Sequence, residues 1–99
     1  MGITSAICST FKKELMTATH NFTTTSGNTM KVALIKAQAS QTGTYSAATT
    51  SYTTITGNSD ELANGSGYTT GGNTLTNVTP TNGTSTTTTA LTDFADSSW

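Results

Sequence analysis

Threonine is the residue that most constrains what this chain can fold into, since it occupies 27 of the 99 positions. Together with valine and isoleucine, 33 residues have a β-branched side chain, which is stiff at χ1 and suits the pleated surface of a strand. Leucine, isoleucine, valine and phenylalanine number only 14, below the roughly 20% that usually separates folded from disordered chains. The net charge of −1 lacks the high charge that accompanies disorder, so the composition predicts β structure.

So few large apolar side chains predict a small core. Domains of this kind are usually stabilised by disulfides, by a metal or by association. Cys8 is the only cysteine and His20 the only histidine, which excludes an internal disulfide and a zinc cluster of cysteines and histidines from one chain. Association remains, so we expect a homo-oligomer or a subunit of a larger shell.

Charge is distributed unevenly along the sequence. All four lysines lie within residues 1–36, which have a net charge of +3, whereas residues 37–99 have a net charge of −4. Opposite charge on the two halves would attract copies of the chain head to tail, although nine charges can also scatter unevenly by chance. The chain contains no arginine, and its slightly acidic balance argues against nucleic acid as a partner.

The sequence predicts no membrane association. It has no run of about 20 apolar residues, which a membrane span requires. Lys12, Lys13 and Glu14 interrupt any stretch that could serve as the apolar region of a secretory signal. We expect a protein that is made in a cytoplasm and leaves it only as part of a particle.

The N-terminal segment has the periodicity of an amphipathic helix over about residues 4–18. Thr4 or Ser5 could cap its first turn. At 100° per residue, one stripe, interrupted by Glu14, collects six apolar residues: Ile3, Ile7, Cys8, Phe11, Leu15 and Ala18. We expect this stripe to pack on a sheet or on a neighbouring subunit.

After His20 the period changes to two, which is typical of strands. Residues 21–25 and 30–36 are predicted to form a hairpin, and residues 73–79 and 84–93 a second pair turning at Asn82–Gly83, with Pro80 ending its first strand. The run TTSGNTM at 24–30 resembles TTGGNTL at 69–75, which predicts two turn-and-strand units. Residues 38–54 are predicted to be a long ordered loop with a helical turn.

Together these patterns predict a single mainly β domain over residues 1–99. It would contain the helix at about 4–18 and a β domain over about 20–99, arranged as a small antiparallel β-sandwich or barrel-like domain. Phe94 and Trp99 would form an apolar cluster near the end of the sequence. We expect Trp99 to pack on a neighbour or to mark a truncated chain.

No catalytic, cofactor or metal site is predicted. Cys8 and His20 would lie about 18 Å apart on one helix, too far for a thiol–imidazole pair. The glycine run at 65–72 has neither the spacing of a dinucleotide-binding loop nor the lysine of a phosphate-binding loop, and is therefore predicted to be a surface loop.

Two acidic pairs, Asp60–Glu61 and Asp93 with Asp96, lack the spacing of a calcium-binding loop. We expect solvated acids or interface partners for the lysines. A Ca²⁺ site between subunits is the alternative.

Several short segments occur in a characteristic order: ITSAIC-x-x-FK-x-EL at 3–15, HNF at 20–22, MKVAL at 30–34, GSGYT-x-GG at 65–72 and TDFAD-x-x-W at 92–99. In this order and spacing the sequence resembles a family of small virion structural proteins of tailed bacteriophages, including phages of marine and cyanobacterial hosts. The resemblance covers most of the chain, with residues 38–64 as the variable part. It implies a non-enzymatic component of the particle, on the capsid or on the tail. Members of the family continue beyond the equivalent of Trp99 with further strands.

We therefore expect a virion protein, made in the host cytoplasm, that binds the outside of the assembled shell as a capsid decoration or cement subunit. Its partners would be further copies of itself and other virion proteins, either the major capsid protein or tail proteins. The alternatives are a phage tail or fibre component that contacts the host and, from another class, an extracellular adhesin or filament subunit. Six apolar residues are the expected interface or core anchors: Ile3, Ile7, Phe11, Leu15, Phe94 and Trp99.

Overall fold

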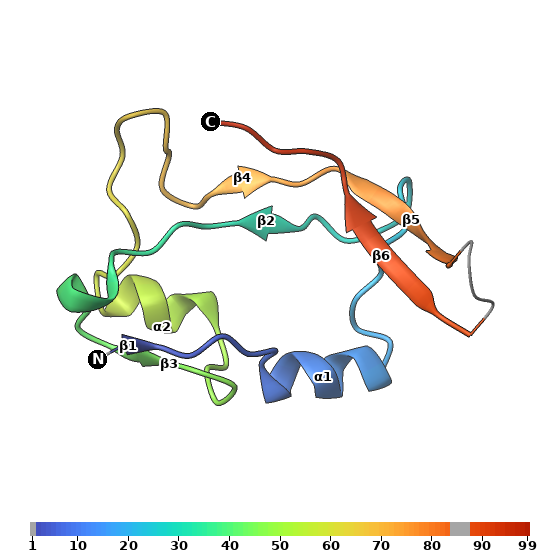
Figure 1. Ribbon diagram of the computed structural model, residues 1–99, viewed down its shortest axis with the longest axis horizontal. Coiled ribbons are helices and arrows are strands. Elements are labelled where there is room, and N and C mark those ends of the chain that lie inside the picture. The colour runs from blue at the N-terminus through green and yellow to red at the C-terminus, as the bar shows by residue number, and fades with distance from the viewer. Residues whose placement is uncertain (1, 84–87) are drawn as a thin grey trace.

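The computed structural model describes residues 2–83 and 88–99 (Figure 1). Their elements follow in the order β1 (Gly2–Ile3), α1 (Ser9–Met16), β2 (Lys31–Val32), the 3₁₀ turn η1 (Gln38–Ser40), β3 (Thr44–Tyr45), α2 (Tyr52–Gly57), β4 (Asn73–Thr74), β5 (Asn77–Asn82) and β6 (Ala90–Phe94). The strands pair as β1–β3, β2–β4 and β5–β6, which makes three separate sheets of two strands. The predicted antiparallel sandwich or barrel is therefore wrong, and the β1–β3 pair is parallel.

The elements lie in two layers (Figure 1). One layer contains β2 and β4 and continues into the β5–β6 hairpin, while the other contains α1, α2 and the β1–β3 pair. The molecule measures 43 × 29 × 25 Å. Its radius of gyration of 15.4 Å exceeds the value of about 13 Å expected for a compact chain of this length. The two layers are therefore less closely packed than those of an ordinary small domain.

The N-terminal helix is shorter than predicted, because α1 begins at Ser9 instead of near residue 4. The Thr4 N–H donates to the Tyr45 carbonyl oxygen at 2.9 Å. The Ser9 N–H donates to the Ala47 carbonyl oxygen at 2.8 Å. These bonds to β3 and to the segment after it hold residues 2–8 extended, so tertiary hydrogen bonding overrides the helical periodicity of this stretch.

The strand that follows the first of the two similar runs pairs with a strand inside the second run. β2 lies antiparallel to β4, with Lys31 opposite Thr74. In the same register the Leu75 N–H donates to the Met30 carbonyl oxygen at 2.8 Å. Met30 and Leu75 are the equivalent last residues of TTSGNTM and TTGGNTL, so the two runs meet at their last residues.

Because β2 pairs with β4, the predicted hairpin between residues 21–25 and 30–36 is wrong. Residues 21–28 form a loop without strand pairing, and the loop is closed by the Asn28 N–H, which donates to the Asn21 carbonyl oxygen at 2.8 Å. The Asn21 N–H donates in return to the Asn28 side chain at 2.6 Å. The asparagine bonds close the loop locally and leave β2 to pair with β4.

The second predicted hairpin is confirmed in its pairing, since β5 and β6 are antiparallel with Asn77 opposite Phe94. β5 does not end at Pro80 as predicted. The register shifts by one residue between Val78 and Thr81, and this bulge accommodates a proline, which has no N–H to contribute to the ladder. Part of the predicted return strand, residues 84–87, lies outside the described residues.

Few side chains are buried, and this scarcity explains why no β-sandwich forms. Among the described residues the buried hydrophobic side chains are Tyr45 and Tyr68, and the buried polar ones are Gln41 and Asp60. The molecule exposes 6849 Å², against about 5300 Å² for a compact monomer of 10.2 kDa. A sandwich needs two apolar sheet faces, and the few apolar side chains of this chain do not line them.

The β2–β4 pairing can be tested at Gly72. This residue has φ 77°, and a Cβ there would lie 2.1 Å from the Val32 carbonyl oxygen. Gly72→Ala should therefore lower the free energy of unfolding by about 2 kcal/mol or more. Gly57→Ala, at the end of α2 where a Cβ would meet nothing within 4 Å, is the matched control and should be neutral or slightly stabilising. Denaturant unfolding at one fixed protein concentration measures both, and equal effects would contradict the pairing.

Candidate interaction surface

Two adjacent carboxylates that follow α2 organise one end of the molecule. Asp60 is fully buried. Its Oδ1 accepts from both the N–H and the hydroxyl of Thr42, each at 2.8 Å. Its Oδ2 accepts from the Gly43 N–H at 2.8 Å and from the Tyr45 hydroxyl. The carboxylate of Asp60 therefore fixes the turn that leads into β3.

Glu61 connects three further segments. Its Oε1 accepts from the Tyr68 hydroxyl and from the Gly71 N–H, each at 2.6 Å. Its Oε2 accepts from the hydroxyl of Tyr52, the first residue of α2. The Tyr68 hydroxyl in turn accepts from the Leu34 N–H at 3.1 Å. Glu61 thus joins α2 to the glycine-containing loop and to the chain beyond β2.

The prediction of solvated acids or lysine partners is wrong for Asp60 and Glu61. Every carboxylate oxygen of the two residues accepts at least one hydrogen bond from within the chain. These oxygens are therefore already engaged and do not form a ready site for a cation. Within residues 2–83 and 88–99 no group of three or more histidine, cysteine, aspartate or glutamate side chains could hold a metal ion.

The network shifts the pKa of its members in opposite directions. Burial opposes ionisation of Asp60, but the hydrogen bonds from Tyr45, Thr42 and Gly43 outweigh it and hold the pKa of this carboxyl well below its usual range. The hydrogen bond from the Tyr52 hydroxyl is the main cause of the lowered pKa of Glu61.

The tyrosines show the reciprocal effect. Burial, followed by the hydrogen bond to a carboxylate, raises the pKa of Tyr45 and of Tyr68. The hydrogen bond to Glu61 is the main cause of the raised pKa of Tyr52. The folded state therefore favours charged carboxylates beside neutral phenols.

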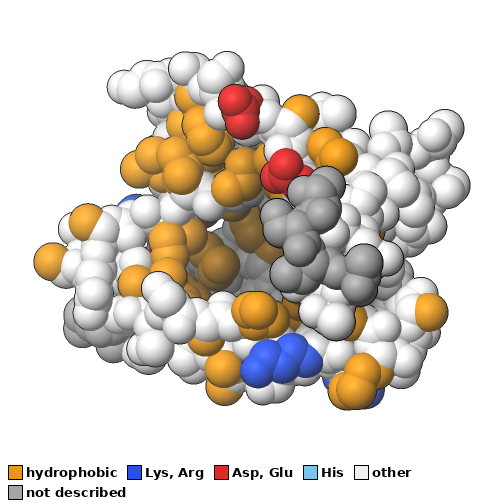
Figure 2. All heavy atoms as spheres, turned by 45° about the vertical axis from the view of Figure 1, so that its right-hand side comes forward, with side chains coloured by type: hydrophobic (Ala, Val, Ile, Leu, Met, Phe, Trp, Pro, Cys, Tyr) orange, Lys and Arg blue, Asp and Glu red, His pale blue; other side chains and the backbone are white. Residues whose placement is uncertain are grey.

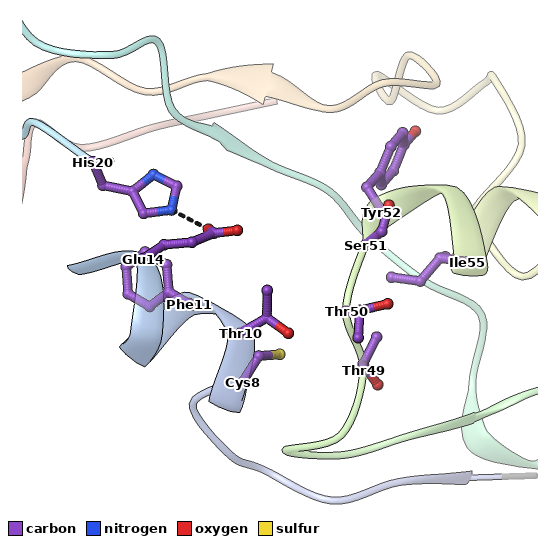
Figure 3. Close-up of a pocket in the computed structure, with 10 residues that line it drawn as sticks. All are labelled: Cys8, Thr10, Phe11, Glu14, His20, Thr49, Thr50, Ser51, Tyr52 and Ile55. Atoms are coloured by element: carbon purple, nitrogen blue, oxygen red, sulfur yellow. Dashed lines mark hydrogen bonds and ion pairs between the residues drawn. The ribbon is translucent and has the colours of Figure 1, made fainter. Parts of the chain in front are cut away.

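A groove of about 350 Å³ separates α1 from the segment that leads into α2 (Figure 3). A second hollow of about 430 Å³ lies beside β2 and shares Tyr52 as a wall. We call the two together the interlayer hollow, and Figure 2 shows hydrophobic side chains on the walls of a hollow between the layers. Its lining residues are Cys8, Thr10, Phe11, Glu14, His20, Thr29, Lys31, Ala33, residues 49–52, Ile55 and Gly71.

The side chains of His20 and Glu14 form a hydrogen bond on the wall of this hollow. Beyond α1, Ala18 adopts φ 57° and the Thr19 N–H donates to the Glu14 carbonyl oxygen at 2.9 Å, which ends the helix and reverses the chain. The reversal brings His20 Nε2 to 2.6 Å from Glu14 Oε2. The partner of His20 is therefore a side chain of α1.

Cys8 lies at the opposite end of α1 from His20 (Figure 3). Its thiol donates to the Ser46 carbonyl oxygen, with an Sγ···O distance of 3.9 Å. Thiol and imidazole line the same groove without forming the hydrogen-bonded pair that activates a nucleophile.

Two of the six predicted anchors, Phe11 and Phe94, come together in an aromatic cluster. The ring centroids of Phe11 and Phe22 are 6.2 Å apart, as are those of Phe22 and Phe94. The His20 ring lies 4.8 Å from Phe11. This cluster joins α1 to β6, with all four side chains half-buried. Phe22 is not among the predicted anchors, although the HNF run contains it.

The other predicted anchors are exposed. Ile7 and Leu15 are 61% and 44% exposed, while Ile3 in β1 is 48% exposed. The expected Phe94–Trp99 cluster is wrong, because Trp99 lies against Tyr68 with ring centroids 6.4 Å apart. These side chains do not belong to a core of this chain, and their role as interface anchors stays a prediction.

The carboxylate–tyrosine network is not among the features expected from the sequence. One signal for it exists, since Asp60 and Glu61 are the only acids between residues 15 and 92, and all three tyrosines of the chain lie within 16 residues of them.

Comparison of the chain with protein-family models, with curated proteins and with solved structures gave no match. Across the described residues, no helix is long and apolar enough to span a membrane.

The network predicts a stability that falls at both ends of the pH scale. A lowered carboxyl pKa stabilises the fold above the ordinary values of 3.8 and 4.5, and that stabilisation is lost as pH falls below them. A raised tyrosine pKa stabilises below the ordinary value of 10.0 and is lost as pH rises above it. We expect a Tm plateau between about pH 5 and 9, with losses on both sides.

Two variants test whether Asp60 is responsible for the loss of thermal stability at low pH. Asp60→Asn should lower Tm at pH 7 by more than about 10 °C, because the buried partners lose a charged acceptor. Thr69→Val, at an exposed loop position outside the network and outside the groove beside α1, is the control and should leave Tm and its pH dependence unchanged. Circular dichroism melts from pH 2 to 11 measure both; a flat profile below pH 5, or equal effects of the two variants, would contradict the network.

Proposed function

We propose that this chain is a non-enzymatic structural subunit of a bacteriophage particle, and specifically a capsid decoration subunit that binds the outside of the assembled shell. The ordered segments that resemble small virion proteins of tailed phages support the phage assignment. The observation that carries the structural role is the exposed surface, which exceeds that of a compact monomer of the same mass by about 1500 Å².

The kind of surface that is exposed supports a subunit built to contact neighbours. Ile7, Leu15 and Met16, in and next to α1, are 61%, 44% and 83% exposed. Val78 and Leu91 on the β5–β6 hairpin are 43% and 47% exposed. Exposed apolar side chains on two separate elements are typical of a protein whose surface is covered in an assembly.

The candidate chemistry of the chain also favours a structural role. The thiol of Cys8 is bonded to a backbone carbonyl, and the carboxylates of Asp60 and Glu61 are occupied by tyrosine hydroxyls and backbone N–H groups. The groups that could act as nucleophile or acid are thus engaged in holding the fold.

The test is to locate the protein in purified particles. Heads and tails are separated, the protein is quantified in each fraction, and intact heads are imaged by electron cryomicroscopy. We expect the protein in the head fraction, with density on the outer surface of the shell. Particles that lack it should release their DNA at a lower temperature, and adding the purified protein back should restore the wild-type release temperature.

If the protein is found elsewhere than on the head, its location would support one of the two alternative functions. Protein found only in the tail fraction, with loss of host adsorption on deletion and unchanged head stability, would indicate the tail or fibre component. Protein absent from particles and found in extracellular filaments would indicate the adhesin or filament subunit.

A further inference from the structure

We infer that the interlayer hollow is a self-association surface, which a second copy of this chain fills. The inference rests on the surface of the chain and not on its assignment to a phage particle, so the two can fail separately. It concerns the groove beside α1, the hollow beside β2 and the rims formed by α1 and β6.

The exposed area favours an extensive interface between identical chains. An excess of about 1500 Å² per chain, buried on both members of a pair, would amount to about 3000 Å². This total lies in the range of about 2,000 to 5,000 Å² that obligate homodimers bury. A transient contact of standard size buries about 800 Å² per partner and would leave roughly half of the excess exposed.

The walls of the hollow have the character of an incomplete core. Phe11, Ala33 and Ile55 line it and are only half-buried. Figure 2 shows that hydrophobic side chains gather around the hollow on this face. A hollow of this size, open and lined by apolar groups, is stabilised when a complementary surface excludes water from it.

The charges identify the occupant as another copy of the chain. Among the described residues, His20 and Glu14 are the pair of ionisable side chains in ion-pair contact. Lys12 and Lys13 on α1, and Asp93 and Asp96 in and after β6, have no ionic partner within residues 2–83 and 88–99. Figure 1 places α1 and β6 on opposite sides of the space between the layers, and Figure 2 shows acidic side chains above the hollow and basic ones below it. A twofold axis through the hollow would place the acidic rim of each copy opposite the basic rim of the other.

Sedimentation velocity over a range of protein concentrations tests the inference. We expect a dimer or a higher symmetric oligomer for the unmodified protein. Thr50→Arg places a long charged side chain in the groove at an exposed position, so it should raise the dissociation constant by at least about tenfold. Thr69→Arg is the matched control, because it adds the same side chain at an exposed loop position that does not line the hollow, and it should leave the dissociation constant unchanged.

A second pair of variants tests the rims. Lys12→Glu with Lys13→Glu in one chain, and Asp93→Lys with Asp96→Lys in another, should each weaken self-association. Because the reversed charges complement each other, mixing the two variants should restore association at the rims where they meet.

Hydrogen exchange of the unmodified protein provides a readout that needs no variant. Amides of α1 and of residues 49–55 should gain protection as concentration rises through the dissociation constant. The inference is overturned by a protein that stays monomeric at all concentrations, by equal association of Thr50→Arg and Thr69→Arg, or by protection gained only outside the hollow. Association that appears only when other virion proteins are added would also overturn it.

Discussion

The hydrogen bonds accepted by Asp60 and Glu61 determine how the remaining segments of this protein are arranged. Asp60 holds the turn into β3, and β3 in turn pairs with β1 and keeps residues 2–8 extended. Glu61 holds Tyr52 at the start of α2 and Tyr68 in the loop before β4. Two neighbouring residues thereby organise the layer of helices and connect it to the layer of β2 and β4. Charged acceptors with neutral phenol donors make strong hydrogen bonds when shielded from water.

Such a polar centre does not by itself stabilise a chain of 99 residues. Ordering each residue costs about 1–2 kcal/mol of conformational entropy, and burial of apolar surface is the main term that offsets this cost. Here the described residues bury only two hydrophobic side chains, both tyrosines, while the aromatic cluster of Phe11, Phe22 and Phe94 stays half-buried. We propose that further apolar burial is supplied from outside the chain, by association with neighbouring subunits. On this proposal, the threonine-rich composition fits a structural subunit whose surface is completed by its neighbours.

The sequence predicts local pairing better than overall arrangement. The pairing of β5 with β6 follows from alternation, which is a local signal. The predicted turn at Asn82–Gly83 is wrong, because Asn82 pairs with Ala90 and the Gly83 N–H donates to the Thr89 carbonyl oxygen. The length of α1 could not be predicted, because the bonds from Thr4 to Tyr45 and from Ser9 to Ala47 join residues far apart in the sequence. The similarity of the two runs is visible in the sequence, yet their meeting at Met30 and Leu75 depends on contacts between segments about 45 residues apart. The hollow was not predictable either, since the residues of its walls come from α1, β2 and the segment before α2.

We propose that this fold is completed by association. Denaturant unfolding measured at protein concentrations from about 1 to 100 µM tests it most directly, because folding that is coupled to association depends on concentration by mass action. The account predicts a midpoint that rises steadily with protein concentration. A cooperative transition whose midpoint is the same at every concentration would show that the single chain is stable alone, and would contradict the account.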